Sequence, residues 1–274
     1  MKWTAFFLIL CGLSLTPKAH AQVVGQSVEY LDGETVLEGY IAYDDEVIVK
    51  RPAVLVVPEW KGLTGYAKGR AEQLAELGYV GFAVDMYGKG IRVETHEEAA
   101  KISGIYRNDR ELMRSRAKAA LNYISNQPQV DPSRLTAIGY CFGGTTVLEM
   151  ARAGFPLLGV ASFHGGFSAP LPAAPGSIQA KVRVFHGDED ASVSAEDVEA
   201  FRAEMRNAEA DWQMTIFGGA VHSFTVPEAG SDKSTGMAYN ETADKDSWKS
   251  LTVFLKEIFE SVPSQEVQKQ SEQE

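Results

Sequence analysis

The chain has 274 residues, of which 45% are hydrophobic and 23% are charged. This composition excludes a chain that is disordered throughout, because disorder requires low hydrophobicity and high charge. The presence of only 2 cysteines excludes a disulfide scaffold. The formal net charge of −11 argues against nucleic acid as a partner and against docking on anionic membranes, since both are negatively charged.

The first 21 residues have the pattern of a secretory signal peptide. Lys2 supplies a positive start, and Ala5–Leu15 is an apolar run too short to span a bilayer, which takes about 20 residues. Residues 19–21 (Ala-His-Ala) have the small-x-small form of a cleavage site. We therefore expect cleavage between Ala21 and Gln22, export to the periplasm or the medium, and no stable membrane association afterwards. An uncleaved membrane anchor is the alternative.

After residue 21, apolar runs rich in β-formers alternate with helical stretches. A run that is apolar at every position suits a strand buried on both faces, and alternation with helices predicts a mostly parallel sheet covered on both sides. The expected buried strands are Ala53–Val57, Val80–Val84, Leu135–Ile138, Leu158–Phe163, Val182–Phe185 and Trp212–Phe217, with weaker strands at Val28–Tyr30 and Leu37–Tyr43. The expected helices are Tyr66–Leu77, Glu94–Ile124 with a break near Ser103-Gly104, Phe142–Arg152, Ser194–Asn207 and Thr242–Phe259.

This order of elements indicates one α/β domain over residues 22–261. The Pro- and Gly-rich stretch Pro170–Gly176 fits a loop within a domain, and no other stretch is long enough to be a linker. Residues 262–274 are polar, rich in Gln and Glu, and without periodicity, so we expect a disordered tail.

The most informative motif is Gly139-Tyr140-Cys141-Phe142-Gly143-Gly144, which follows the expected strand Leu135–Ile138 and opens a helix. This is the strand–turn–helix context of a nucleophile elbow, with Cys in place of Ser. Cys141 would lie at a helix N-terminus, where the helix dipole favours a thiolate, and the backbone N–H of Phe142 would face a developing oxyanion. The alternative is a core cysteine beside a glycine-rich turn.

An acidic residue and a histidine each follow a later expected strand, as Cys141 follows the strand Leu135–Ile138. Asp190 comes after the strand that ends at Phe185, and His222 comes after the strand that ends at Phe217. The order Cys141, Asp190, His222 is the nucleophile–acid–histidine order of α/β-hydrolases. Because the carboxyl ends of parallel strands form one edge of a sheet, we expect the three side chains to meet there.

These motifs resemble the dienelactone hydrolase family, whose members are α/β-hydrolases with a Cys–Asp–His triad. The resemblance covers nearly all of the chain after residue 21. It implies that Cys141 attacks the carbonyl of a small ester or lactone, while His222, oriented by Asp190, acts as base and then as acid. It also implies that Glu59 contacts the resting thiol and helps to deprotonate it, and that Trp60 supplies the second oxyanion-hole N–H beside that of Phe142.

Two of the positions that the resemblance assigns to the substrate pocket differ from the family pattern. The family's lactone-cleaving members hold a substrate carboxylate with arginines, but this chain has Lys89 and Val226 at the two corresponding positions. Lysine is a point charge and cannot form a planar bidentate clamp. We therefore expect a preference for neutral or weakly anionic small esters. The residues expected to line the pocket are Tyr87, Lys89, Tyr140, His164 and Phe224.

Two other functions compete with hydrolysis. A non-catalytic ligand-binding protein on the same fold would need no base, so the Asp190–His222 pair counts against it. A thiol redox sensor normally needs a resolving cysteine, and none would remain beside Cys141 after cleavage. A zinc site at His164, His186 and His222 has no supporting spacing, so we expect no metal and no organic cofactor. The sequence does not indicate an oligomeric state.

Overall fold

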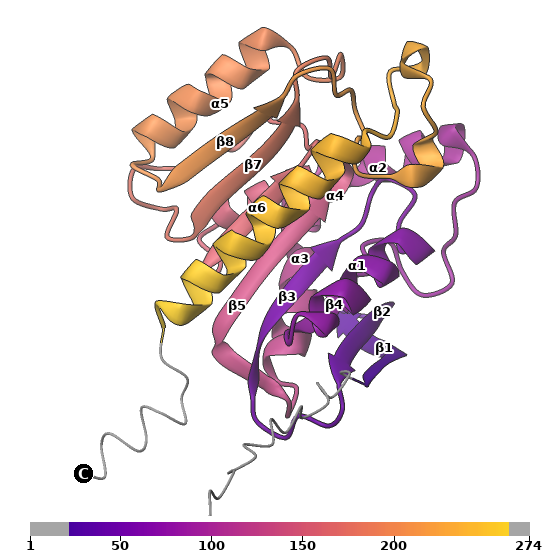
Figure 1. Cartoon of the computed structure of the whole chain (residues 1–274), viewed down its shortest axis with the longest axis vertical. Helices are drawn as coiled ribbons and strands as arrows, with labels where there is room; N and C mark the ends of the chain where they lie inside the picture. The colour runs from indigo at the N-terminus through magenta and orange to yellow at the C-terminus, as the bar shows by residue number, and fades with distance from the viewer. Residues whose placement is uncertain (1–21, 263–274) are drawn as a thin grey trace, which may run out of the picture.

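The structure is a computed structural model that describes residues 22–262; the predicted signal peptide and residues 263–274 of the predicted tail lie outside the described residues. An eight-stranded sheet has the order β1-β2-β4-β3-β5-β6-β7-β8, with helices on both faces (Figure 1). Pairing is parallel from β4 through β8, which confirms the predicted single α/β domain. The strands are β1 Val23–Asp32, β2 Thr35–Asp44, β3 Arg51–Val57, β4 Val80–Ala83, β5 Val130–Tyr140, β6 Gly159–Phe163, β7 Lys181–Gly187 and β8 Trp212–Phe217.

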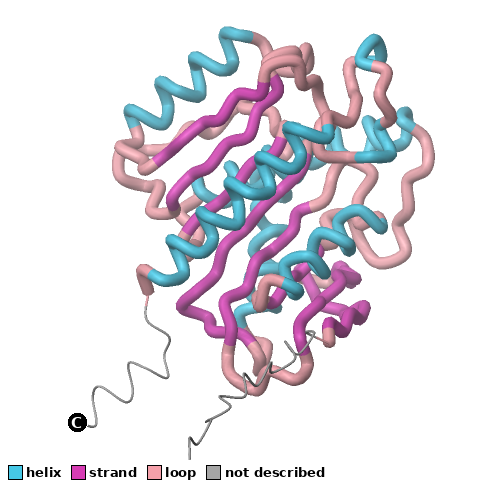
Figure 2. The backbone as a smooth tube through the Cα atoms, viewed as in Figure 1, coloured by secondary structure: helices cyan, strands magenta, loops and turns pink. Residues whose placement is uncertain are grey.

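The two weaker predicted strands form a long antiparallel hairpin at one edge of the sheet. β1 and β2 pair along their whole length, and β2 then pairs antiparallel with β4. Figure 2 shows this end of the sheet at the lower right of the molecule. β1 is much longer than predicted, because it is the edge strand and most of its positions are exposed or half-exposed and need not be apolar. β2, which lies between β1 and β4, is close to its predicted bounds.

Each face of the sheet has its own core, as the strand alternation requires. In β3, Val54 and Val56 pack on one face, where α1 and α6 lie, whereas Ala53, Leu55 and Val57 pack on the other, with α3, α4 and α5. Figure 1 shows α6 running across the sheet. The helices are α1 Gly65–Glu76, α2 His96–Asn108, α3 Arg110–Ser125, α4 Phe142–Arg152, α5 Ala195–Asn207 and α6 Glu241–Glu260, with the short 3₁₀ helices η1 Pro227–Ala229 and η2 Lys233–Thr235.

The predicted helix break near Ser103-Gly104 is wrong. α2 continues through both residues and ends at Asn108, and α3 begins at Arg110. The break falls at Asp109, whose extended backbone (φ −123°, ψ 90°) ends α2 and whose side chain accepts the backbone N–H of Leu112 at 2.9 Å. A single glycine costs a helix too little to break it, whereas an aspartate N-cap stabilises the start of a new one.

The turn from β5 into α4 is packed directly against the end of β3. A Cβ added to Gly139 would lie 2.0 Å from the Gly143 carbonyl oxygen, and one added to Gly143 would lie 2.1 Å from the Val57 carbonyl oxygen. Both contacts are with backbone, which cannot move aside as a flexible side chain would. Glycine is therefore required at these positions by close approach of the backbone.

We expect Gly143→Ala to lower the free energy of unfolding by about 3 kcal/mol or more, because backbone has to shift to admit the methyl group. Gly104→Ala is the matched control: it lies inside α2 with nothing within 4 Å of its added Cβ, and should stabilise the protein by about 0.5–1 kcal/mol. Urea unfolding of the two variants measures both effects. Equal stabilities would show that the turn tolerates a side chain.

Candidate active site

The sheet and α4 hold Cys141 in a backbone conformation that few residues adopt. Cys141 lies between β5 and α4 with φ 54° and ψ −112°, a positive φ that costs a non-glycine residue energy. It is the N-cap of α4, so the helix dipole and the free N–H groups of the first turn face its side chain. The thiol is 7% exposed and reaches a surface pocket. This environment favours negative charge on sulfur or on an atom bound to it.

His222 and Asp190 form a close pair at the same edge of the sheet. Asp190 follows β7 and His222 follows β8, and His222 Nδ1 lies 2.8 Å from Asp190 Oδ2. The Asp190 side chain is fully buried, whereas His222 keeps 13% exposure. Ser192 donates its backbone N–H and its hydroxyl to the other carboxylate oxygen, at 3.0 Å and 2.5 Å. This arrangement holds the Nδ1 proton of His222 toward Asp190 and leaves Nε2 for a partner in the pocket.

The pKa values of the pair follow from these contacts. Burial raises the pKa of Asp190, but hydrogen bonds from His222 and Ser192 and the positive charge of His222 outweigh it and lower the pKa to about 2. Burial lowers the pKa of His222, but the charge of Cys141 and hydrogen bonds with Asp190 and Cys141 outweigh it and raise the pKa to about 10. These contacts favour the positively charged imidazolium of His222, which lies between the Asp190 carboxylate and the sulfur of Cys141.

A second histidine lies behind this pair and stays neutral. His164 is fully buried, and burial lowers its pKa well below the usual range. Its Nδ1 accepts the backbone N–H of Cys141 at 3.1 Å, and its Nε2 lies 2.8 Å from Thr225 Oγ1, which also accepts the Tyr66 hydroxyl. The His164 and His222 rings meet edge to face at 5.2 Å. His164 therefore holds the backbone of the turn at Cys141 and packs against the His222 ring.

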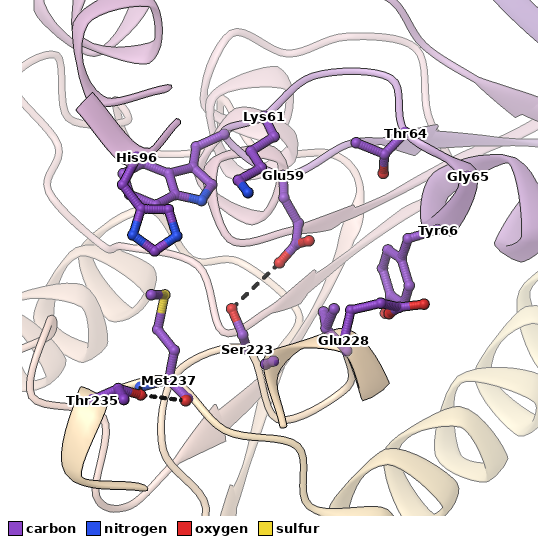
Figure 3. Close-up of a pocket in the computed structure, with 13 residues that line it drawn as sticks. Glu59, Lys61, Thr64, Gly65, Tyr66, His96, Ser223, Glu228, Thr235 and Met237 are labelled. Atoms are coloured by element: carbon purple, nitrogen blue, oxygen red, sulfur yellow. Dashed lines mark hydrogen bonds between the residues drawn. The ribbon is translucent and has the colours of Figure 1, made fainter. Parts of the chain in front are cut away.

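Two pockets meet above the thiol. The thiol pocket, about 460 Å³, is lined by Cys141, His222, Arg107, Thr145 and Ser192 among others. The carboxyl pocket, about 520 Å³, is lined by Glu59, Lys61, Tyr66, His96 and Glu228 among others (Figure 3). Both pockets share Trp60, Thr235 and Met237, so they adjoin. The segment between β8 and α6, which supplies Thr235 and Met237, lies beside α2 (Figure 1).

Glu59 follows β3 and lies in the carboxyl pocket. Its Oε1 accepts the Ser223 hydroxyl at 3.4 Å, and Figure 3 shows its carboxylate aimed at that residue. Burial raises the pKa of Glu59, while the charge of His222 lowers it. The ring of the next residue, Trp60, lies against that of His96 in a tilted arrangement, with the ring centres 5.3 Å apart, and the Trp60 carbonyl accepts the Tyr87 hydroxyl at 2.8 Å. These contacts fix the loop on which the second oxyanion donor was predicted.

Residues 37–259 match the dienelactone hydrolase family. The chain belongs to this family. Among solved structures, it is similar to the protein named m3DLH (38% identity, TM-score 0.81) and to P91, described as a dienelactone hydrolase-like promiscuous phosphotriesterase from metagenomic libraries (40%, TM-score 0.79); each comparison covers 86% of this chain and 98% of the other. The fold and the family together make this protein a dienelactone hydrolase-like hydrolase.

Two further relatives match a shorter part of the chain. The carboxymethylenebutenolidase of Pseudomonas sp. (strain P51) is 32% identical over 153 residues, which are 53% of this chain and 63% of the relative. An uncharacterized protein of Caenorhabditis elegans, K02A2.1, is 39% identical over 150 residues, which are 54% of this chain and 94% of that protein.

The predicted substrate pocket of this dienelactone hydrolase-family protein needs correction. Tyr87, Tyr140, His164 and Phe224 are buried beneath the site rather than lining either pocket, and their rings pack into the two cores and against one another. Lys89 points away from the site and pairs with Glu29 at 2.5 Å on the surface. A position next to a turn does not reveal which way its side chain points, and this direction depends on tertiary packing. The residues that line the thiol pocket and were not predicted to do so include Thr145, Ser192, Thr235 and Met237.

The described part of the chain shows neither of two other kinds of site. Among residues 22–262, no three or more His, Cys, Asp or Glu side chains are grouped so as to hold a metal ion. No helix in the same range combines the length and the hydrophobicity needed to cross a bilayer.

The coupling between His222 and Cys141 is testable by titration. We expect Cys141→Ala to lower the pKa of His222 from about 10, because the charge of Cys141 is the largest contribution that raises it. NMR titration of the His222 ring measures this shift. Because the pKa of His222 is higher in the folded protein than the ordinary value of 6.5, the protonated ring stabilises the native state. This stabilisation is complete below pH 6.5 and is lost as the pH rises through 10.

The free energy of unfolding of Cys141→Ala should therefore depend less on pH between these values. Identical His222 titrations in both proteins would contradict the coupling.

Proposed function

We propose that this hydrolase cleaves small carboxylic esters or lactones with Cys141 as the nucleophile. The observation that supports this proposal is the geometry around the thiol: a positive-φ cysteine at a helix N-terminus, next to a histidine that is paired with a buried aspartate 2.8 Å away. The pattern is that of an activated nucleophile, in which a base is oriented by a third group.

The proposed reaction has two halves. The Cys141 thiolate attacks the substrate carbonyl carbon, and the carbonyl oxygen becomes an oxyanion that accepts the backbone N–H groups of Phe142 and Trp60. As the tetrahedral intermediate collapses, His222 donates its proton to the departing alkoxide, and a thioester remains on Cys141. His222 then takes a proton from the water that attacks the thioester. The second tetrahedral intermediate collapses with cleavage of the C–S bond, so the carboxylic acid leaves and the Cys141 thiolate and the His222 imidazolium are restored.

Glu59 has a distinct place in this proposal. Its carboxylate lies in the adjoining carboxyl pocket and is electrostatically coupled to His222 rather than hydrogen-bonded to the thiol in this structure. We retain the proposal that it assists deprotonation of Cys141 when substrate binds. Its raised pKa makes it a better proton acceptor than an exposed carboxylate.

A second candidate substrate class comes from the 40% identity to P91, which is described as a promiscuous phosphotriesterase. The same thiolate and oxyanion donors would serve attack at phosphorus in an aryl phosphotriester. We also propose, from the amino-terminal pattern alone, that the protein is exported and loses residues 1–21.

We expect Cys141→Ala to reduce kcat/KM for p-nitrophenyl acetate by about 10⁴-fold or more, and Asp190→Asn to reduce it by about 10³–10⁴-fold, because both remove a member of one catalytic unit. Acid quenching during turnover should trap an acyl group on Cys141 that mass spectrometry detects. Steady hydrolysis by the well-folded Cys141→Ala variant would disprove the nucleophile.

We expect Glu59→Gln to lower kcat/KM by about tenfold with little change in the melting temperature, because glutamine keeps the Ser223 hydrogen bond but is no base. Glu228→Gln, on the exposed rim of the same pocket, is the control and should retain activity. If Glu59→Gln is as active as the native enzyme, Glu59 is only a structural polar residue.

A further inference from the structure

The proposed nucleophile and the proposed base follow strands that are not neighbours. Cys141 follows β5 and His222 follows β8, and β6 and β7 lie between these two strands. Adjacent strands of a sheet lie about 4.8 Å apart, so the ends of β5 and β8 are separated by about 14 Å. The loop after β8 therefore has to return toward β5, and contacts have to hold it there, for the two side chains to meet.

One threonine hydroxyl connects the loop of His222 to the turn at Cys141. Thr225, three residues after His222, is fully buried, and its Oγ1 lies 2.8 Å from His164 Nε2. His164 Nδ1 accepts the backbone N–H of Cys141 at 3.1 Å. We call this chain of contacts from Thr225 through His164 to Cys141 the threonine bridge. It is separate from the contact between His222 and Asp190.

The threonine bridge is compatible with only one arrangement of protons. A backbone N–H can only donate, so Nδ1 of His164 has to be without a proton in order to accept it. Burial lowers the pKa of His164 well below the usual range, so the ring is neutral and carries its single proton on Nε2. Nε2 therefore donates to Thr225 Oγ1. A side chain without an acceptor at position 225 would leave this buried N–H without a partner.

Two helices hold Thr225 from behind. Tyr66 of α1 donates its hydroxyl to Thr225 Oγ1 at 2.7 Å, and Arg70 of the same helix donates to the Thr225 carbonyl at 3.2 Å. Arg70 also donates to the Tyr66 hydroxyl at 3.2 Å and pairs with Asp244 of α6. Its guanidinium lies 4.8 Å from the centre of the Trp248 ring, also on α6. These contacts fix both the backbone and the hydroxyl of Thr225.

The residues that the bridge joins have strained backbones. Among residues 22–262, four non-glycine residues have a positive φ, and three of them lie here: Cys141 at 54°, His164 at 39° and Ser223 at 58°. Such conformations cost energy and persist only where the surrounding structure holds them. The hydrogen bond between His164 and Cys141 joins two of the three, and Thr225 lies two residues after the third.

We propose that Thr225 is a positioning residue that sets the place of His222 relative to Cys141 through His164. Thr225 is fully buried and lines neither the thiol pocket nor the carboxyl pocket, so it has no contact with substrate. Its effect has to pass through the two segments that it links. The proposal rests on the proposed function, because it requires Cys141 and His222 to act together.

The proton on His164 tests the bridge in the native enzyme. Long-range proton–nitrogen NMR spectra distinguish a ring nitrogen that carries a proton from one that does not. We expect a neutral ring at pH 7 with its proton on Nε2, because Nδ1 accepts the Cys141 N–H. A proton on Nδ1, or a doubly protonated ring, overturns the proposal. This measurement needs no substitution, so it decides against the bridge even where a variant fails to fold.

Thr225→Val keeps the branched shape of the side chain and removes the acceptor. The unsatisfied Nε2 proton then disturbs the ring that holds the Cys141 backbone. We expect kcat/KM for p-nitrophenyl acetate to fall about 10–100-fold, as displacement of a reacting group by about 1 Å does. Alkylation of Cys141 by iodoacetamide should slow as well, because His222 no longer faces the sulfur. Thr225→Ser keeps a hydroxyl and should restore most of both rates.

Thr136→Val is the matched control. Thr136 is fully buried in β5, and its hydroxyl has no hydrogen-bond partner among the described residues. Loss of this hydroxyl should leave both rates unchanged. The proposal is overturned if Thr225→Val equals the native enzyme in both rates and only its melting temperature falls, because Thr225 is then merely structural. It is also overturned if Thr136→Val loses as much as Thr225→Val.

A double substitution shows whether Thr225 acts through His164. His164→Phe removes both ring nitrogens, so adding it to Thr225→Val should cost little more than the larger single loss. Losses that multiply would show that the two residues act separately, and would overturn the proposal.

Two measurements separate this proposal from ester hydrolysis. If the native enzyme cleaves no ester, the proposed function fails, but alkylation and NMR still test the bridge. Burial lowers the pKa of His222, and the charge of Cys141 contributes most to raising it to about 10. We therefore expect a lower pKa of His222 in Thr225→Val, where the ring and the sulfur are no longer held together. An unchanged His222 titration together with unchanged alkylation overturns the proposal.

Discussion

The Val57 carbonyl lies where any side chain on Gly143 would have to be, and this backbone contact determines the geometry of the site. The turn after β5 therefore packs against the end of β3, and the chain enters α4 with a positive φ at Cys141. Cys141 directly follows β5, and its side chain reaches the pocket at the edge of the sheet. The strain is held by the parallel sheet, whose central strands are buried on both faces.

Two histidines with opposite electrostatics complete that arrangement. His222 lies between Asp190 and Cys141, and their negative charge outweighs the effect of burial, so it is positive at neutral pH. His164, only 5.2 Å away, has no carboxylate bonded to it and is neutral. A neutral ring can accept the Cys141 backbone N–H, which an imidazolium could not do. Histidine is thus a positively charged hydrogen-bond donor at position 222 and a neutral hydrogen-bond acceptor at position 164.

The sequence was sufficient for features that depend on local pattern. Apolar runs marked β3 to β7, and the order of Cys141, Asp190 and His222 placed each of them after a strand whose carboxyl end lies at the same edge of the sheet. The run at β8 predicted a strand correctly, but not its burial, because β8 is the last strand of the sheet and its positions are half-exposed or exposed. It was insufficient wherever side-chain direction decides the outcome. Tyr140 and Phe224 turn into the core, and Lys89 turns to solvent. Arg107 lines the thiol pocket from the last turn of α2, and no motif in the sequence marks it.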